Sequence, residues 1–422
     1  MVSGERLRLC AVASNELAYN PRLVKALSYL EEKGWSGSAV FCRTDPRLVG
    51  VADQVYAVHP WELGIVKATD DSLRGTIRHY SGAVLQGTAG VLSRRRLWPA
   101  RAADHALKRY DSAMRRLLKR TRADIYLCNL PENLRACMWW AQRVGAAVWY
   151  DSQEYFRGQG DYSLWQHRAI ASIEDRWIRQ CSVVTAASVP IAAELRKLYA
   201  NLQVRVIHNV PRMVAIVKRE ESTQATAPLQ VYWRGAAPSL RGRGIENVLR
   251  ALRLMKSPFV FTVQGDTRAL ARDEIVAFAG SLGIADRVVF KQSARPDRLV
   301  EAGLAYDVGC AVEPGVDENQ HLTSSNKVFE YMMAGLAVVA SDLPGLRYVV
   351  DRCGCGLLVD PTDPAGLASV LDGLADDRGR LRSLKLAARV SAMAEFNFER
   401  EMDALLPVLV TAADRPRRRA EE

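Results

Sequence analysis

Two charged side chains stand in an otherwise apolar stretch near the end of the chain. The stretch reads SSNKVFEYMMAGLAVVASD at 324–342, and its charges are Lys327 and Glu330. Its pattern predicts a helix with Ser324, Ser325 or Asn326 as its N-cap, and this helix leads into a buried strand. A lysine in the first turn opposes the helix macrodipole, and a carboxylate among apolar residues is costly unless it is hydrogen-bonded. Both charges therefore need an explanation.

One ligand, a nucleoside diphosphate, would satisfy both charges. Its phosphates would accept hydrogen bonds from the ammonium of Lys327 and from the free backbone N–H groups of the first turn, at Ser325 and Asn326. Glu330 lies one turn deeper on nearly the same face, where its carboxylate would accept the hydroxyls of a ribose. The alternative is a local Lys327–Glu330 ion pair, which would contribute only about 0.2–0.5 kcal/mol. We therefore favour the ligand.

A second basic segment supports a phosphate site in the same half of the chain. VYWRGAAPSLRGRGIENVLRAL (231–252) predicts a strand, a glycine-rich loop and a helix that begins near Gly244. Arg243 comes directly before that helix, so we predict that its guanidinium and Lys327 clamp a diphosphate from two sides and are catalytic. Glycines let a backbone come close to a ligand. The other residues that we assign to this ligand site are Arg234, Gly235 and Gly265.

Short apolar strands alternate with helical segments along both halves of the chain. The predicted strands lie at 6–13, 38–42, 124–129, 146–151, 182–187 and 204–209, and again at 229–234, 259–265, 287–291, 306–312, 336–341 and 356–360. The predicted helices lie at about 21–33, 102–121, 132–144, 164–179, 189–199, 244–256, 269–282, 326–334, 364–375 and 379–413. This alternation predicts an α/β protein with two doubly wound, Rossmann-like domains that face one cleft. Such sheets bind ligands beyond the carboxyl ends of their strands.

The formal net charge of +11 favours an anionic partner. Much of the excess lies in 93–122, where many Arg and Lys stand against only Asp104 and Asp111, and a short basic run ends the chain at 415–419. For 93–122 two interpretations stay open: a helix lying on an anionic membrane surface, or a solvated basic helix whose apolar underside is in the core. A nucleic-acid partner is not expected, because aromatic residues do not alternate with the basic ones as in a single-strand groove.

Composition points to a cytoplasmic protein, with the inner face of the cell membrane as the alternative location. No apolar run reaches the ~18 residues that span a bilayer, and the N-terminal apolar stretch is too short for a signal peptide. The 8 Cys are scattered without a CxxC pair, which indicates reduced thiols and no metal site. The loop after the first strand, SNELAYNPR (14–22), lacks the GxGxxG fingerprint, so no nicotinamide or flavin cofactor is expected.

Several stretches of the sequence resemble the motifs of one known family. NKVFEYMMAGLAVVASDLPG (326–345) is similar to the donor-site signature of GT-B fold glycosyltransferases of the retaining group called family 4, or glycosyl transferases group 1. Further stretches resemble the family in its order: NPRLVKALSYLEEKGW (20–35), WYDSQEYF (149–156), VIHNVP (206–211) and RGIENVLRAL (243–252). The resemblance implies a nucleotide-sugar donor in the C-terminal domain, an acceptor in the N-terminal domain, no metal, and a C-terminal helix that crosses back to the first domain.

The expected domains follow from the strand–helix alternation and from the polar segment REESTQATAP (219–228), and the resemblance adds their roles. They are an acceptor-binding domain at 1–215, a linker at 216–228, a donor-binding domain at 229–395, and a crossing helix with a basic tail at 396–422. The residues assigned to the acceptor side are Asn20, Arg22, Asp151 and Glu154. Arg22 has the surface as its alternative, Glu154 has structural capping, and His208 reads as a packed strand-end histidine rather than a catalyst.

Three positions depart from the family pattern. Gln153 stands where the family commonly has His beside the reacting sugar, and Gln can hydrogen-bond a hydroxyl but cannot carry a proton near neutral pH. We keep Gln153 in the predicted catalytic set on this hydrogen-bonding role. Leu322 stands where many members carry a Glu that holds sugar hydroxyls, which leaves the donor sugar open. Ala337 stands where Pro is frequent, with structural consequence only.

The function predicted on these grounds is a glycosyltransferase that moves a sugar from a nucleoside-diphosphate sugar to a glycan or lipid-linked acceptor with retention. Its place would be cell-surface polysaccharide or glycoconjugate synthesis. Two alternatives stay open: a nucleotide-sugar 2-epimerase of the same fold, and a non-catalytic nucleotide-sugar-binding subunit.

Overall fold

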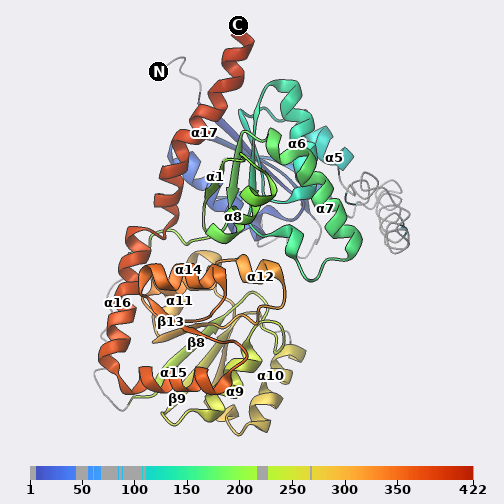
Figure 1. The fold of residues 1–422 in the computed structure, drawn as a ribbon. Helices are drawn as coiled ribbons and strands as arrows, with labels where there is room; N and C mark the ends of the chain where they lie inside the picture. Colours follow the sequence, from blue (N-terminus) through green and yellow to red (C-terminus); the bar gives the residue numbers. More distant parts are fainter. Residues whose placement is uncertain are drawn as a thin grey trace. The chain divides into compact units, whose positions relative to one another are not determined.

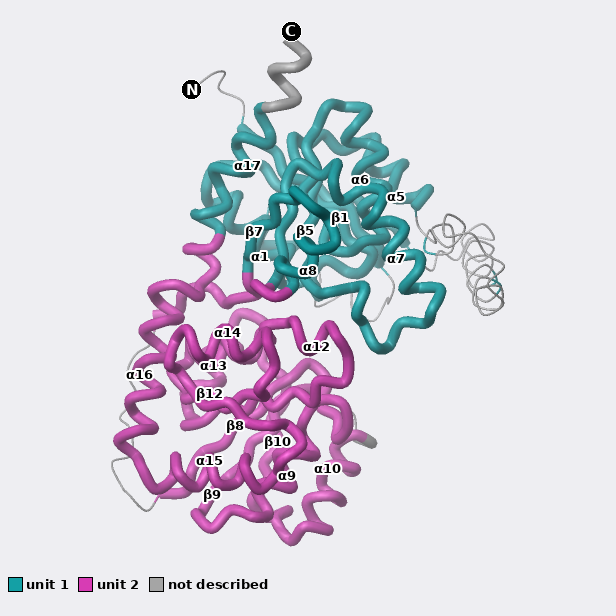
Figure 2. Tube along the Cα trace, in the orientation of Figure 1, with its two compact units in different colours: residues 1–187, 191–207, 402–422 teal, residues 188–190, 208–401 magenta. Residues whose placement is uncertain are grey.

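The computed structural model describes residues 6–43, 56–59, 61–67, 84, 88, 107, 111–215, 227–266 and 269–421. The chain divides into two compact units (Figure 2). Unit 1 consists of Met1–Ala187, Ile191–Ile207 and Met402–Glu422, and unit 2 consists of Ser188–Pro190 and His208–Glu401. The segment 208–215 contacts other residues of unit 2, for example from the His208 N–H to Glu401 and from Arg389 to the carbonyl of Val214. Most of the expected linker, 216–226, lies outside the described residues.

Unit 1 is drawn with unit 2 as a ribbon in Figure 1. It contains a seven-stranded, fully parallel sheet in the order β3-β2-β1-β4-β5-β6-β7. Its strands are β1 (Arg8–Ala13), β2 (Ser36–Arg43), β3 (Glu62–Lys67), β4 (Ile125–Cys128), β5 (Ala147–Ser152), β6 (Val183–Ala186) and β7 (Val204–Val206). The sequence predicted all of these except β3. The segment ELGIVK lies at the sheet edge with only Val66 fully buried, so it lacks the apolar run of a central strand.

The main helices of unit 1 connect these parallel strands. They are α1 (Pro21–Glu32), α5 (Asp111–Leu118), α6 (Pro131–Val144), α7 (Leu164–Trp177) and α8 (Val189–Leu198). Of the basic segment 93–122, only residue 107 and residues 111–122 are described. There Met114 and Leu118 of α5 are buried, so in this part of the segment the apolar underside lies in the core.

Unit 2 contains a six-stranded parallel sheet in the order β10-β9-β8-β11-β12-β13. Its strands are β8 (Leu229–Arg234), β9 (Phe259–Gln264), β10 (Val288–Lys291), β11 (Val308–Ala311), β12 (Ala337–Ser341) and β13 (Gly356–Val359). All six were predicted. The helices are α9 (Ile245–Leu254), α10 (Ala269–Ser281), α11 (Leu299–Gly303), α12 (Glu318–Leu322), α13 (Asn326–Ala334), α14 (Pro344–Cys353), α15 (Pro364–Asp376) and α16 (Arg378–Ala394).

Alternate side chains of β8 point to opposite faces of this sheet. Val231 and Trp233 belong to the core that α9, α10 and α15 cover. Tyr232 instead packs against the rings of Tyr306 and Tyr331, the second of which comes from α13. Helices therefore cover both faces, as a doubly wound sheet requires.

The C-terminal helix α17 (Phe398–Glu421) begins in unit 2 and belongs to unit 1 from Met402 onward. Its Asp403 carboxylate accepts hydrogen bonds from Tyr29 and from Lys33. The predicted fold class, two doubly wound domains with a helix that returns to the first, is confirmed. The helical tail predicted at 379–413 consists of two helices, because Asn397 ends α16 with bonds to carbonyls in its last turn and accepts one from the Arg400 N–H in α17.

Of the helices in the described residues, none combines the length and the apolar character needed to cross a bilayer.

Candidate functional site

The unit 2 sheet reverses its strand order between β8 and β11. From β8 the chain moves outward to β9, and from β11 it moves outward to β12 on the other side. At such a switch point the connections leave in opposite directions, which opens space beyond the carboxyl ends of the two strands. Arg234 ends β8, and Glu313 follows β11 by two residues. The helices α9 and α13 begin at the same end of the sheet, after the strands that precede them.

Lys327 lies in the first turn of α13 with its side chain 10% exposed. Its ammonium forms an ion pair with Oε1 of Glu313 and lies 4.9 Å from the centroid of the Trp233 ring. The same Oε1 accepts a hydrogen bond from the Ser325 hydroxyl at 3.3 Å. The Lys327–Glu330 pair that we considered as the alternative is therefore wrong, since Lys327 pairs with an acid from another segment.

Glu330, one turn further along α13, forms an ion pair with Arg234 at the end of β8. The next residue, Tyr331, fixes this arrangement. Its hydroxyl accepts a hydrogen bond from the Arg234 N–H at 3.1 Å and donates to the carbonyl of Cys310 at 3.3 Å. Two ion pairs thus join α13 to the ends of β8 and β11, and the predicted residues Lys327, Glu330 and Arg234 lie in one cluster.

Arg243 is exposed immediately before α9, whose N-cap is Gly244. The indole N–H of Trp233 donates to the Arg243 carbonyl at 3.2 Å, so one side chain supports both predicted phosphate ligands. Gly244 has a φ of 81°, and a Cβ there would lie 1.6 Å from the carbonyl oxygen of Val312. Glycine therefore lets the start of α9 come directly against the segment that carries Glu313.

Gly235 and Gly265, predicted to let a ligand approach, have a local packing role. A Cβ on Gly265 would lie 2.3 Å from the carbonyl oxygen of Gly235. The Gly235 N–H in turn donates to the carbonyl of Gln264 at 3.0 Å. The loops after β8 and β9 are thus in backbone contact, and their binding role stays a prediction.

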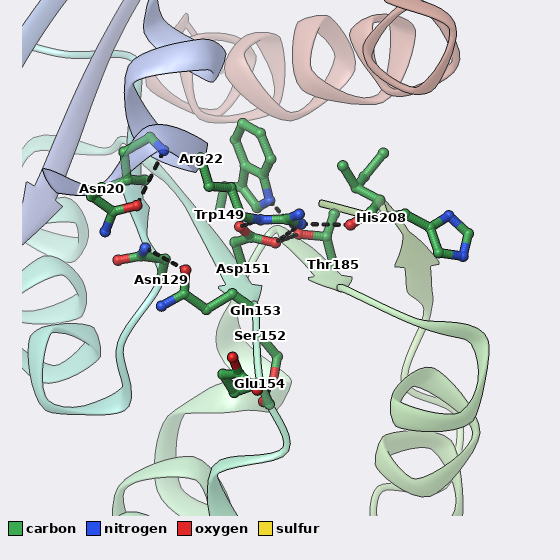
Figure 3. Close-up of polar contacts among 12 residues, drawn as sticks. Asn20, Arg22, Asn129, Trp149, Asp151, Ser152, Gln153, Glu154, Thr185 and His208 are labelled. Carbon is green, nitrogen blue, oxygen red and sulfur yellow. Dashed lines mark hydrogen bonds and ion pairs between the residues drawn. The ribbon is translucent and has the colours of Figure 1, made fainter. Parts of the chain in front are cut away.

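In unit 1, Arg22 and Asp151 form a buried ion pair (Figure 3). Arg22 Nη2 donates to Asp151 Oδ1 at 2.7 Å and to the carbonyl of Ile207 at 2.6 Å. Asp151 Oδ1 also accepts a hydrogen bond from Thr185, which Trp149 supports in turn. The surface alternative for Arg22 is therefore wrong. The pair ties α1 to the ends of β5 and β7, and its contact with an acceptor stays a prediction.

Gln153 lies just beyond β5, where its Oε1 accepts a hydrogen bond from Asn129 Nδ2 at 3.0 Å (Figure 3). Asn20 caps α1, because its Oδ1 accepts a hydrogen bond from the N–H of Leu23 at 3.3 Å, and its contact with an acceptor stays a prediction. Glu154 accepts a hydrogen bond from the Ser152 hydroxyl through its backbone carbonyl.

Three polar residues at the switch point of unit 1, between β1 and β4, were not predicted from the sequence: Ser14, Asn129 and Glu132. Asn129 follows β4 and is fully buried. Glu132, in the first turn of α6, accepts a hydrogen bond from Ser14 at 2.8 Å, and burial raises the pKa of its carboxyl group. The signal was present in the Asn129–Glu132 run after a predicted strand. The parallel order that makes β1 the neighbour of β4 was not known.

His208 is packed among aromatic rings, as expected. Its ring lies 5.4 Å from that of Phe329 and 5.3 Å from that of Phe396, measured between centroids. Its Nδ1 and the Glu401 carboxylate are 2.6 Å apart, and its backbone N–H donates to the same carboxylate.

Comparison with known proteins agrees with this architecture. A family model described as glycosyl transferases group 1 matches residues 230–377. The D-inositol 3-phosphate glycosyltransferase of Rhodococcus jostii is 35% identical over 174 residues, which are 40% of this chain and 35% of that protein. The protein of the same name from Xylanimonas cellulosilytica is 31% identical over 44% of this chain and 43% of its own length. The chain thus spans less than half the length of these curated relatives.

Solved structures match over nearly the whole chain. HepE of Anabaena in complex with UDP and glucose has a TM-score of 0.66 at 14% identity, over 96% of this chain and 100% of that one. Sucrose-phosphate synthase from Thermosynechococcus elongatus has a TM-score of 0.68 at 16% identity, with the same coverage of both chains. At these identities the likeness establishes the fold. Residues 230–377 therefore resemble the glycosyl transferases group 1 family, and the chain as a whole has the GT-B fold.

Proposed function

We propose that this protein transfers a sugar from a nucleoside-diphosphate sugar to a hydroxyl of a glycan or lipid-linked acceptor, with retention of the anomeric configuration. One observation carries the proposal: Lys327, Arg234 and Glu330 gather at the switch point of the unit 2 sheet, beside the start of α13. Helix N-termini and basic side chains favour phosphate, and a carboxylate one turn deeper suits ribose hydroxyls.

The chemistry asked of these residues is stabilisation of the leaving diphosphate. As the bond between the anomeric carbon and the phosphate oxygen breaks, negative charge grows on the diphosphate, where Lys327, Arg243 and the first turns of α9 and α13 would meet it. The acceptor oxygen forms its new bond on the same face and passes its proton to the departing phosphate. This route requires no protein nucleophile, so Gln153 need only orient a hydroxyl.

Fewer observations bear on the acceptor than on the nucleotide sugar. The curated relatives are D-inositol 3-phosphate glycosyltransferases, so a phosphorylated polyol is the first soluble acceptor to test. The amides of Asn129 and Gln153 provide donors and acceptors that suit hydroxyl groups. Synthesis of a cell-surface polysaccharide or glycoconjugate is the setting that we propose.

Thermal denaturation with UDP, GDP, ADP and their sugars would identify the donor, because a ligand that binds the native state raises the melting temperature. The selected donor, incubated with acceptors, should give a product with the anomeric configuration of the donor by NMR. If the protein converts the nucleotide sugar to its epimer when no acceptor is present, the activity is that of the nucleotide-sugar 2-epimerase instead. If the nucleotide sugar binds but is not transferred to any acceptor, the remaining function is that of a non-catalytic nucleotide-sugar-binding subunit.

We also propose contact with an anionic membrane surface, in line with the net charge of +11. Three cations surround the ring of Trp139: the distances to its centroid are 4.7 Å from Arg115, 5.7 Å from Lys119 and 4.4 Å from Arg143. Basic residues near an anionic surface contribute about 1 kcal/mol each.

Sedimentation with vesicles tests this contact. The protein should bind phosphatidylglycerol vesicles and not phosphatidylcholine vesicles, and the double change Lys119→Glu and Arg143→Glu should weaken binding. The control Arg176→Glu, on the exposed surface of α7, should leave it intact. Equal binding by all three proteins would contradict a role for this surface.

A further inference from the structure

Glu313 is an acidic residue inside the cluster that the proposed function assigns to a diphosphate. It pairs with Lys327, the principal phosphate ligand of that proposal, and its side chain is 12% exposed. The formal charges of the cluster sum to zero, because the two cations Lys327 and Arg234 are paired with the two anions Glu313 and Glu330. A diphosphate that binds Lys327 must therefore take over an ammonium that already has a carboxylate partner.

The backbone around Glu313 is held on two sides, so the residue does not belong to a loose loop. The Ser341 hydroxyl at the end of β12 donates to the Glu313 carbonyl at 2.6 Å. The carbonyl of the preceding residue, Val312, lies against Gly244 at the start of α9. Only the side chain is then free to change partners when a phosphate reaches Lys327.

The carboxylate has unused acceptor capacity. Both of its contacts, with Lys327 and with Ser325, use Oε1. Among the described residues, Oε2 has no hydrogen-bond partner. A carboxylate offers about four lone-pair positions, and a largely buried one that loses its cation needs new donors.

The nucleotide sugar itself would supply those hydrogen-bond donors. In a nucleoside-diphosphate sugar the sugar is bonded directly to the phosphate, so its hydroxyls are the groups nearest to a phosphate held by Lys327. We propose that Glu313 is a specificity-determining residue of the donor site, which exchanges Lys327 for hydroxyl groups of the donor's sugar. This inference rests on the proposed function. No covalent step is involved, and the phosphate replaces Glu313 as the partner of Lys327.

Calorimetry on the full chain with UDP and UDP-glucose tests the exchange. In Glu313→Gln the ratio of the dissociation constants, UDP-glucose over UDP, should rise by about 10-fold or more relative to the unchanged protein, because a hydrogen bond from the sugar to a charged acceptor is lost. The affinity for UDP alone should be unchanged or tighter, because Glu313 no longer competes for Lys327. The control Glu318→Gln, exposed on α12, should change neither value.

A second set of ligands identifies the groups on the sugar. UDP-xylose and UDP-2-deoxyglucose each lack part of the hydroxyl pattern of glucose. The loss of the contacted group should weaken binding to the unchanged protein and have little further effect in Glu313→Gln, a non-additivity that marks direct contact. Should Glu313→Gln fail to fold, Glu313→Asp, which keeps the charge on a shorter side chain, should give the same direction with a smaller change.

The outcomes separate this inference from the proposed function. An unchanged dissociation-constant ratio in Glu313→Gln, or loss of UDP binding itself, overturns the role of Glu313 while the donor site stands. Absence of binding of UDP, GDP, ADP and their sugars to the unchanged protein overturns the donor site and this inference with it.

Discussion

At the scale of single residues, the ammonium of Lys327 is nearly removed from water. Its side chain is 10% exposed, an indole ring lies beneath it, and a carboxylate pairs with it. Electrostatic interactions strengthen as the local dielectric falls, so a phosphate that reaches this ammonium interacts with it more strongly than it would at the surface. The same surroundings hold the lysine in one position before any ligand arrives.

Replacement of Lys327 or Arg243 by Ala should lower the transfer rate about 10²- to 10³-fold, the cost of removing one preorganised donor from a developing anion. The protein should remain folded by circular dichroism. The control Lys256→Ala, exposed in the same unit, should keep full activity. Full activity in either cluster variant would reject the two-sided clamp.

Glu330 is expected to distinguish ribose from deoxyribose. Calorimetry should show the unchanged protein binding UDP about 10-fold more tightly than 2′-deoxy-UDP, because the ribose hydroxyl donates to a charged acceptor. Glu330→Gln should reduce this preference. If the variant discriminates as well as the unchanged protein, Glu330 does not bind the ribose hydroxyl.

At the scale of elements, glycines decide how closely α9 approaches the end of β11. Gly242 and Gly244 both have positive φ values, 75° and 81°. A Cβ on Gly242 would meet nothing within 4 Å, whereas one on Gly244 would lie 1.6 Å from the Val312 carbonyl oxygen. Gly242→Ala should therefore cost about 1–2 kcal/mol of stability for its backbone strain alone.

Gly244→Ala should cost at least about 1–3 kcal/mol more, because α9 or the Val312 segment must move as well. It should also weaken nucleotide binding, which Gly242→Ala should largely preserve. Urea denaturation and calorimetry on the two variants provide the comparison. Equal effects of the two changes would show that the contact between Gly244 and Val312 does not position the site.

Elements were predictable where one residue pattern determined them. The helix at 326–334 was visible in the chain, since a serine at the N-cap position, an apolar face and a glycine directly after the last turn are local signals. Glu313 was not predictable in the same way. It lies in a polar run with Asp317 and Glu318, and no local spacing says which acid meets Lys327. That choice depends on how the loop after β11 packs against the first turn of α13.

At the scale of the whole molecule, α17 completes the core of unit 1 with residues far away in sequence. Leu405, Leu409 and Ala413 of this helix are buried. Burial and the hydrogen bond to Asp403 raise the pKa of Tyr29 on α1 to about 12, so this tyrosine remains a donor to α17 well above neutral pH. The return of the chain was expected from a family resemblance rather than from any pattern in the tail.

Leu409→Ala should lower the stability of unit 1 by about 2–5 kcal/mol, the usual cost of truncating a fully buried leucine. Hydrogen exchange should accelerate in β1, β4 and β5 and change little in the unit 2 sheet. Leu386→Ala, at a position 66% exposed on α16, is the control. Equal acceleration in both sheets would mean that the two units unfold as one.

The central claim is that Lys327 binds the terminal phosphate of a nucleoside diphosphate. The most direct test compares the affinities for UDP and for UMP, both measured by calorimetry. The unchanged protein should bind UDP at least about 10-fold more tightly, the value of one charge-assisted contact. This advantage should disappear in Lys327→Ala while UMP binding is kept. An equal advantage in both proteins, or none in the unchanged protein, would contradict the account.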